Sequence, residues 1–210
     1  MQFERSSYMK IETVMEALIK NGYSVRYFAS GKEAADYLDV SLDGRIIGFG
    51  DSATMSKMEL YQKLSAHNTV YDPNQSKDND AFLEIAQKCL TTDIYLTSVN
   101  AMSETGELVN IDGTGNRIAG SLFGHKKIYF IISTNKIEPT LEKAVWRARN
   151  IAAPKNARRY NLRTPCAVRG DRCYDCSSPD RICNALTIYM KKMNDIEDVE
   201  IVLIGEELGF

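Results

Sequence analysis

The sequence predicts an α/β protein in which helices cover both faces of an open sheet. Strand-like and amphipathic helical segments alternate along most of the 210 residues, which is typical of such sheets. Residues 127–133 form the most apolar strand-like segment, rich in β-branched and aromatic side chains, so we expect them near the centre of the sheet. The length suits one hydrophobic core, and we expect residues 1–210 to form a single domain.

Helices are predicted where apolar residues recur at i, i+3, i+4 and i+7. The first run ends at Gly22, because glycine tolerates a left-handed cap; its apolar residues are Ile11, Val14, Met15 and Leu18. A second helix is expected from Ser30, with Glu33 at capping-box spacing. Further helices are expected from residue 52, through residues 82–89 and over residues 139–150. Strands are expected at residues 23–28, 45–49, 69–71, 93–99, 107–111, 127–133 and 199–204.

Composition argues against several classes of partner. The formal net charge is -2, so the chain has no general attraction to nucleic acid or to anionic membranes. Its apolar runs are shorter than the roughly 18 residues that a membrane helix needs, and its first residues do not resemble a signal peptide. We therefore expect a cytoplasmic protein that binds neither nucleic acid nor membrane. The sequence contains no flavin or nicotinamide fingerprint.

Four of the five cysteines lie in one segment, with the spacing Cys166-x6-Cys173-x2-Cys176-x6-Cys183. In a reducing compartment, clustered thiols bind metal or do redox work more often than they form disulfides. Four thiolates suit either tetrahedral zinc or an iron–sulfur cluster, and the many arginines nearby would stabilise thiolates. Reduced thiols, or a redox dithiol at Cys173 and Cys176, are the alternative. We expect residues 153–183 to form a subdomain or flap on the main sheet.

A glycine-containing loop joins a predicted strand to a predicted helix at residues 48–54. Gly48 and Gly50 would let the backbone approach a ligand, while Asp51, Ser52 and Thr54 lie at the start of the helix, where free N–H groups attract anions. This pattern predicts a phosphate or carboxylate site. The alternative is an ordinary turn in which Asp or Ser caps the helix.

A second polar segment, residues 97–117, surrounds two short strands and has the composition of a ligand cleft. Glu104 is a candidate base or nucleophile, and Arg117 is a candidate partner for a carboxylate. The other candidate ligand-binding residues in this segment are Asn100, Thr105, Gly106 and Asn116. The alternative is a hairpin whose polar side chains satisfy its own turns.

Other side chains are expected to be structural. Cys89 lies on the apolar stripe of its helix and should be an inert buried thiol. His67 and His125 occur in polar surroundings and are expected at the surface, whereas Trp146 is expected to pack against the protein. Residues 195–200 are acidic and should form a solvated helix end and loop.

Several runs of the sequence together resemble the LUD domain, the lactate-utilisation protein family. They are TSVNAMSETGELVNIDGTGNR, KKIYFIISTNKIEP, AAPKNARR, TPC, CYDC, SSPDRIC and VLIGEELGF. The resemblance covers nearly the whole chain and is most specific over residues 93–183. It implies a three-layer α/β/α sandwich like that of the sugar-isomerase and coenzyme A-transferase superfamily. It also implies that residues 48–52 form the anion-binding turn of that superfamily, and that Glu104 lies where related transferases place a catalytic glutamate.

The resemblance also suggests a function. Larger members of the family take part in oxidising L-lactate with iron–sulfur partners. It therefore implies a redox component of organic-acid metabolism that binds a small anionic metabolite and an iron–sulfur cluster or metal, and that works with a redox partner protein. One alternative is a transferase-like or isomerase-like enzyme with a structural zinc. Another is a non-catalytic ligand-binding or assembly protein, and a homodimer is compatible with each.

Overall fold

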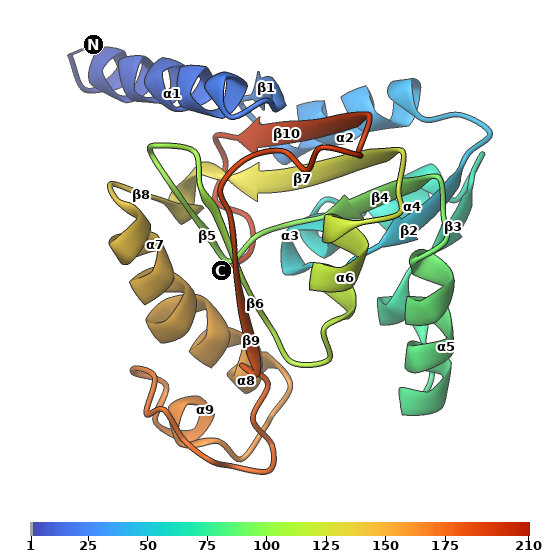
Figure 1. The fold of residues 1–210 in the computed structure, drawn as a ribbon, viewed down its shortest axis with the longest axis vertical. Coiled ribbons are helices and arrows are strands. Elements are labelled where there is room, and N and C mark those ends of the chain that lie inside the picture. The colour runs from blue at the N-terminus through green and yellow to red at the C-terminus, as the bar shows by residue number, and fades with distance from the viewer. Residues whose placement is uncertain (1) are drawn as a thin grey trace.

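Six parallel strands form the main sheet of the protein, as the computed structural model shows (Figure 1). The structure describes the backbone of residues 2–210 and the side chains of residues 11–210. The strands, in their order across the sheet, are β1 (Ser24–Phe28), β10 (Asp198–Ile204), β7 (Lys127–Ser133), β4 (Ile94–Thr97), β2 (Ile46–Phe49) and β3 (Thr69–Tyr71). β7 lies inside the sheet, between β10 and β4, as its apolar sequence predicts.

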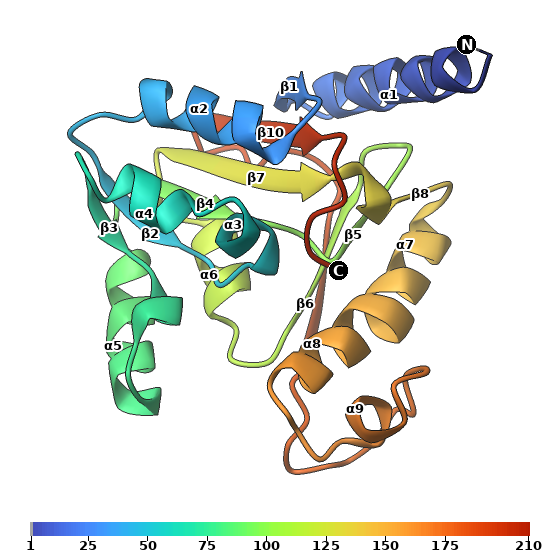
Figure 2. The same ribbon diagram turned by 180° about the vertical axis from the view of Figure 1, so that it is seen from behind.

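Helices cover both faces of this sheet because alternate side chains of each strand point to opposite faces. Along β7, Tyr129 and Ile131 join the core beneath α2 (Gly31–Ser41), α3 (Ala53–Lys57) and α4 (Leu60–Leu64). Ile128 and Phe130 join the opposite core, with α1 (Gln2–Lys20), α5 (Asn79–Cys89) and α6 (Asn116–Leu122). Figure 2 shows the first group of helices in front of the sheet. The expected three-layer α/β/α architecture is thus confirmed.

A second, smaller sheet lies on the α1, α5 and α6 side. Its strands are β8 (Ile137–Glu138), β5 (Ala101–Ser103), β6 (Leu108–Asp112) and β9 (Ala185–Tyr189), in that order. Leu108 packs toward the main sheet, whereas Val109 and Ile111 face α7 (Leu141–Arg147). Only β6 is predicted from the sequence. β8 and β5 have two and three residues and are too short to show a periodic pattern, and β9, with five residues, is also missed.

The cysteine-rich segment packs against this second sheet. A continuous helical stretch leads into it, composed of α7, a π-helical turn η3 (Ala148–Ala152) and α8 (Ala153–Arg159). α9 (Pro165–Arg169) packs on α8, and Cys183 packs beside Ala144 and Ala148. Figure 1 shows α9 and the following loop at the end of the molecule away from α1.

Individual side chains test the remaining structural expectations. Cys89 is buried as predicted, and His67 contacts Asp39 and Asp43 near the surface. His125 is only 2% exposed, which overturns its expected surface position, because its ring stacks on Tyr95. Trp146 is 55% exposed rather than packed, since the apolar stripe of α7 faces the second sheet without it.

The acidic stretch at residues 195–200 also differs from expectation. Its last three residues begin strand β10, and Glu200 is buried. Glu200 accepts a hydrogen bond from Tyr37 and pairs with Lys127. These partners keep a carboxylate inside a strand that the sequence suggests is solvated. Over the part of the chain with described structure, no helix is both long and apolar enough to cross a membrane.

Candidate functional site

The carboxyl ends of β2, β4 and β7 meet at one edge of the main sheet and leave a crevice there. The chain passes from β2 to α3 on one face of the sheet, and from β4 to the second sheet on the other face. Open α/β sheets bind ligands where neighbouring strands diverge in this way. The 3-10 turn η2 (Thr134–Lys136) follows β7 and brings Lys136 into the crevice.

Lys136 is only 4% exposed, and its ammonium group has three hydrogen-bond acceptors. Nζ donates to Thr54 Oγ1 at 2.9 Å, to Ser98 Oγ at 3.0 Å and to the carbonyl of Val99 at 3.1 Å. Both hydroxyls give their own hydrogen to backbone carbonyls, Thr54 to Leu208 and Ser98 to Ile131. They therefore act as acceptors toward Nζ, which is the arrangement that a protonated lysine requires.

The positive charge of Lys136, by contrast, is not paired with a negatively charged side chain among the described residues. None of the ion pairs formed by the described side chains involves Lys136, whereas Arg117 pairs with Asp112 at 3.9 Å and Arg147 with Glu138 at 3.7 Å. Burial, followed by the charges of Arg147 and Arg117, lowers the pKa of Lys136 from its ordinary value of 10.5 to about 7. A buried cation without a carboxylate is costly, so this position favours a negatively charged ligand.

A cavity of about 40 Å³ lies beside Lys136. Five residues of the sequence prediction line it, and they are Asp51, Ser52, Thr54, Asn100 and Arg117. Four of its polar residues were missed, and they are Ser98, Lys136, Asn156 and Arg159. A cavity of this size holds a group of a few atoms, such as a carboxylate or phosphate, but not a nucleotide. One sequence signal could have found Lys136: it follows the most apolar strand of a parallel sheet by three residues.

The carboxylate of Asp51, on the rim, is held by the last residue of α8, Arg159, and by the residue that follows it, Tyr160. Tyr160 donates its hydroxyl to Asp51 Oδ2 at 2.5 Å, and Arg159 donates to Asp51 Oδ1 at 3.3 Å. The guanidinium of Arg159 lies over the ring of Tyr160. Burial and then the negative charge of Asp51 raise the pKa of Tyr160 to about 12. Asp51 is thus neutralised by neighbours, which reduces its repulsion of an anion in the cavity.

The other predicted ligand-binding residues lie outside this cavity. A Cβ on Gly48 would be 2.8 Å from the carbonyl of Cys89, and one on Gly50 would be 2.5 Å from the hydroxyl of Tyr95. Both glycines therefore allow close packing. Thr105 and Gly106 form the turn between β5 and β6, where Gly106 has a φ of 90° and lies against α1.

Glu104 and Asn116 are also separate from the cavity. The backbone N–H of Glu104 donates to the carbonyl of Glu138 where β5 meets β8. Asn116 starts α6, and its carbonyl accepts a hydrogen bond from Tyr95. Glu104 is not among the residues that line the cavity beside Lys136.

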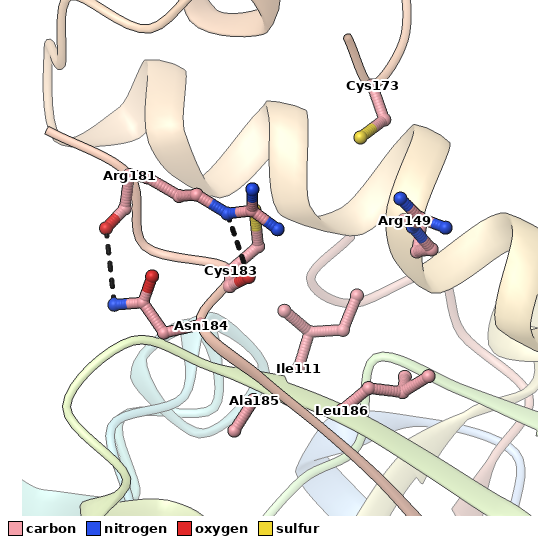
Figure 3. Close-up of a pocket in the computed structure, with 8 residues that line it drawn as sticks. All are labelled: Ile111, Arg149, Cys173, Arg181, Cys183, Asn184, Ala185 and Leu186. Carbon is pink, nitrogen blue, oxygen red and sulfur yellow. Dashed lines mark hydrogen bonds between the residues drawn. The ribbon is translucent and has the colours of Figure 1, made fainter. Parts of the chain in front are cut away.

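The cysteine-rich segment lines a second, larger pocket of about 240 Å³ (Figure 3). Cys173 and Cys183 lie on its wall together with Arg149 and Arg181. Between the two cysteines of the C-x-x-C turn, Asp175 has a φ of 46°, and its N–H donates to Cys173 Sγ at 3.3 Å. Such N–H to sulfur bonds are one way in which proteins tune thiolate-bound clusters.

The four cysteines do not converge on a common point. Cys166 lies on α9, where its sulfur contacts Thr164 Oγ1 at 3.2 Å, whereas Cys173 and Cys176 are near enough to Cys183 to raise its pKa, after the larger effect of burial. Within the described part of the chain, no three histidine, cysteine or acidic side chains are placed to hold one metal ion. The donor types suit a thiophilic metal, but the spacing of the sulfurs does not match a mononuclear site.

Comparison with known proteins identifies the class of molecule. The family model of the LUD domain matches residues 11–204, so the chain belongs to the LUD domain family. A DUF162 family protein from Deinococcus radiodurans is similar in structure, with a TM-score of 0.55 and 13% sequence identity, over 94% of this chain and 98% of that chain. This likeness supports the fold.

A second solved structure is more distant. Ribose 5 phosphate isomerase A from Neisseria gonorrhoeae matches with a TM-score of 0.34 and 14% identity, over 53% of this chain and 54% of that chain. A likeness this slight supports no conclusion. No curated protein matches the sequence.

Proposed function

We propose that this LUD-domain protein binds the anion of a small organic acid in the pocket beside Lys136. One observation carries the proposal: a buried ammonium has a full set of hydrogen-bond acceptors but no carboxylate partner among the described side chains. A bound anion would supply the missing charge, and Arg117, Asn156 and Arg159 line the same cavity. Membership of a family associated with lactate utilisation favours 2-hydroxy and 2-oxo acids.

Calorimetry of the protein with L-lactate, pyruvate and inorganic phosphate tests this proposal. At least one of these anions should bind, whereas lactamide, the neutral amide of lactate, should not. Lys136→Met keeps the length of the side chain but removes its charge, so this variant should lose the binding while keeping its circular-dichroism spectrum. Equal binding of the anion by the parent and by Lys136→Met would contradict the proposal.

A second candidate function is a redox role with an iron–sulfur cluster, or a structural zinc, on the cysteines. The N–H to sulfur bond at Cys173 and the closeness of Cys173 and Cys176 to Cys183 favour it, although the sulfurs would have to move together to bind. The sequence has no flavin or nicotinamide fingerprint, so a redox role would need an electron partner protein. Elemental analysis of anaerobically purified protein distinguishes iron with sulfide, zinc, and free thiols.

A further inference from the structure

Lys136 has the surroundings of a nucleophile as well as those of an anion-binding group. We propose that its amine forms a covalent imine with the carbonyl carbon of a 2-oxo acid. This inference rests on the anion site proposed above, and it names both the substrate class and the reaction. Lactate has a hydroxyl instead of the carbonyl, so it would bind in the same pocket without reacting.

The hydrogen bonds of Lys136 permit the neutral amine that the reaction needs. A hydroxyl hydrogen can rotate, so a serine or threonine can either accept from an ammonium or donate to an amine. Thr54 donates to the carbonyl of Leu208 over a long distance of 3.3 Å, and this bond is easily exchanged for one to Nζ. When Lys136 loses a proton, the hydroxyl of Thr54 therefore changes from an acceptor of a hydrogen bond from Nζ to a donor of one to Nζ.

The charges around Lys136 favour the same neutral form. Burial and the nearby cations Arg147 and Arg117 bring its pKa to about 7, so a large share of the amine is unprotonated at neutral pH. Enzymes that form Schiff bases activate a lysine in these two ways, by burying it and by placing another cation beside it. No ion pair among the described side chains stabilises the ammonium form, because the carboxylate on the rim, Asp51, pairs with Arg159 instead.

Other residues that line the cavity are placed to bind the carboxylate of the substrate. Arg117 lines it from the start of α6, while Asn156 and Arg159 line it from α8. A carboxylate held by these groups would place the adjacent carbonyl carbon toward Nζ. Arg159 also holds Asp51, which leaves part of its guanidinium for a ligand.

The reaction is an exchange of oxygen for nitrogen. Nζ adds to the carbonyl carbon, forming a carbon–nitrogen bond, and the carbonyl oxygen leaves as water with the two amine protons. The imine then takes up one proton from the solvent. The step needs no oxidant or reductant, and it is reversible.

Reductive trapping tests the inference. The protein is incubated with pyruvate and sodium cyanoborohydride, which delivers hydride to a protonated imine, and the product is analysed by intact and peptide mass spectrometry. The expected product carries one adduct on Lys136, with the added mass of pyruvic acid less one oxygen atom. L-lactate with the same reductant should give no adduct, and Lys136→Arg, which keeps the cation, should not be labelled by pyruvate.

The outcomes separate this inference from the proposed function. Binding of pyruvate by calorimetry without an adduct on Lys136 would overturn the inference and leave the anion site standing. Labelling of Lys136 no faster than that of exposed lysines such as Lys155 would also overturn it. If none of the anions binds, both the inference and the proposed function fail.

Discussion

Nζ of Lys136 lies 3.0 Å from Oγ of Ser98, and this contact joins the segments that follow two neighbouring strands of the main sheet. Ser98 directly follows β4, and Lys136 ends the turn after β7. Both strands are buried and paired with each other, so the two groups are anchored at the ends of adjacent strands inside the main sheet. A reactive group placed in this way is organised before a ligand arrives, which lowers the cost of binding.

Replacing Lys136 with methionine should change how stability depends on pH. Between pH 7 and 10.5 the unfolded chain holds a proton on Lys136 that the folded chain has lost, so the stability of the parent rises with pH across this window. Relative to the parent, Lys136→Met should thus gain stability as the pH falls through the window, by at most about 5 kcal/mol. Urea unfolding at the two ends of the window measures the effect.

Lys155→Met is the matched control, because Lys155 is exposed on α8 and outside the pocket. It removes the same formal charge and should leave the pH dependence of stability as it is in the parent. Identical pH profiles for the parent and Lys136→Met would show that the folded protein does not depress the pKa of this lysine.

Anion affinity should fall as the pH rises above about 7, because the ligand binds the ammonium form of Lys136. The dissociation constant should increase by up to about tenfold per pH unit. Lactate is the suitable probe, since its carboxylate stays ionised throughout this range and it cannot form an imine. Calorimetry in buffers of different ionisation enthalpy should show proton uptake on binding above pH 7. Affinity that is constant with pH would exclude Lys136 as the charged partner.

Arg159→Gln should weaken anion binding by about 10- to 100-fold, the value of one charge-assisted hydrogen bond. Part of this loss arises because Asp51 loses the donor that neutralises it and then repels the ligand. Adding Asp51→Asn to Arg159→Gln should therefore recover part of the affinity. Lys155→Gln, on the same helix, is the control and should bind as the parent does. An unchanged dissociation constant in Arg159→Gln would remove this residue from the site.

The thiols should differ in their reactivity toward iodoacetamide. Burial raises the pKa of Cys89 to about 12, and thiolates are the reactive form, so Cys89 should stay unlabelled in the folded protein. The four cysteines of residues 153–183 are each partly exposed and should be labelled. After anaerobic reconstitution with iron and sulfide, Cys173, Cys176 and Cys183 should be protected together. Labelling that reconstitution does not change would argue for free thiols.

The sequence predicts those features of the fold that depend on neighbouring residues. The apolar composition of β7 gives its interior position, and the cap at Ser30 accepts a hydrogen bond from the N–H of Glu33 as its spacing suggests. The second sheet depends instead on contacts between distant segments, such as Leu108 with Tyr189. No local pattern encodes that pairing.

The site is predictable only in part, for the same reason. Asp51, Ser52 and Thr54 are found because they follow a strand and begin a helix, which is a local signal. Lys136 appears in the sequence as an ordinary lysine in a polar turn. Its burial arises from segments distant in the sequence, among them the one around Gly209, and its missing carboxylate is a property of the assembled site. The sequence therefore predicts which edge of the sheet carries the site, but it does not predict that Lys136 lies at the centre of that site.

Gly209 should control access to the pocket. It has a φ of 73°, and a Cβ there would be 2.5 Å from Thr54 Oγ1 and 3.5 Å from Lys136 Nζ. Alanine at this position should therefore push the segment at residues 208–210, which includes the lining residue Phe210, away from the cavity. We expect lactate to associate faster, as followed in stopped-flow measurements by calorimetry or fluorescence. Pyruvate should also be trapped faster on Lys136. We also expect a loss of about 1 kcal/mol in stability from the left-handed backbone.

Gly44→Ala isolates the contribution of the backbone. Gly44 also has a positive φ, of 62°, but a Cβ there would meet nothing within 4 Å. Gly44→Ala should lose a similar amount of stability without any change in ligand association. If Gly209→Ala behaves like Gly44→Ala in both measurements, the segment does not limit entry, and ligands reach Lys136 from the side of Asn156 and Arg159.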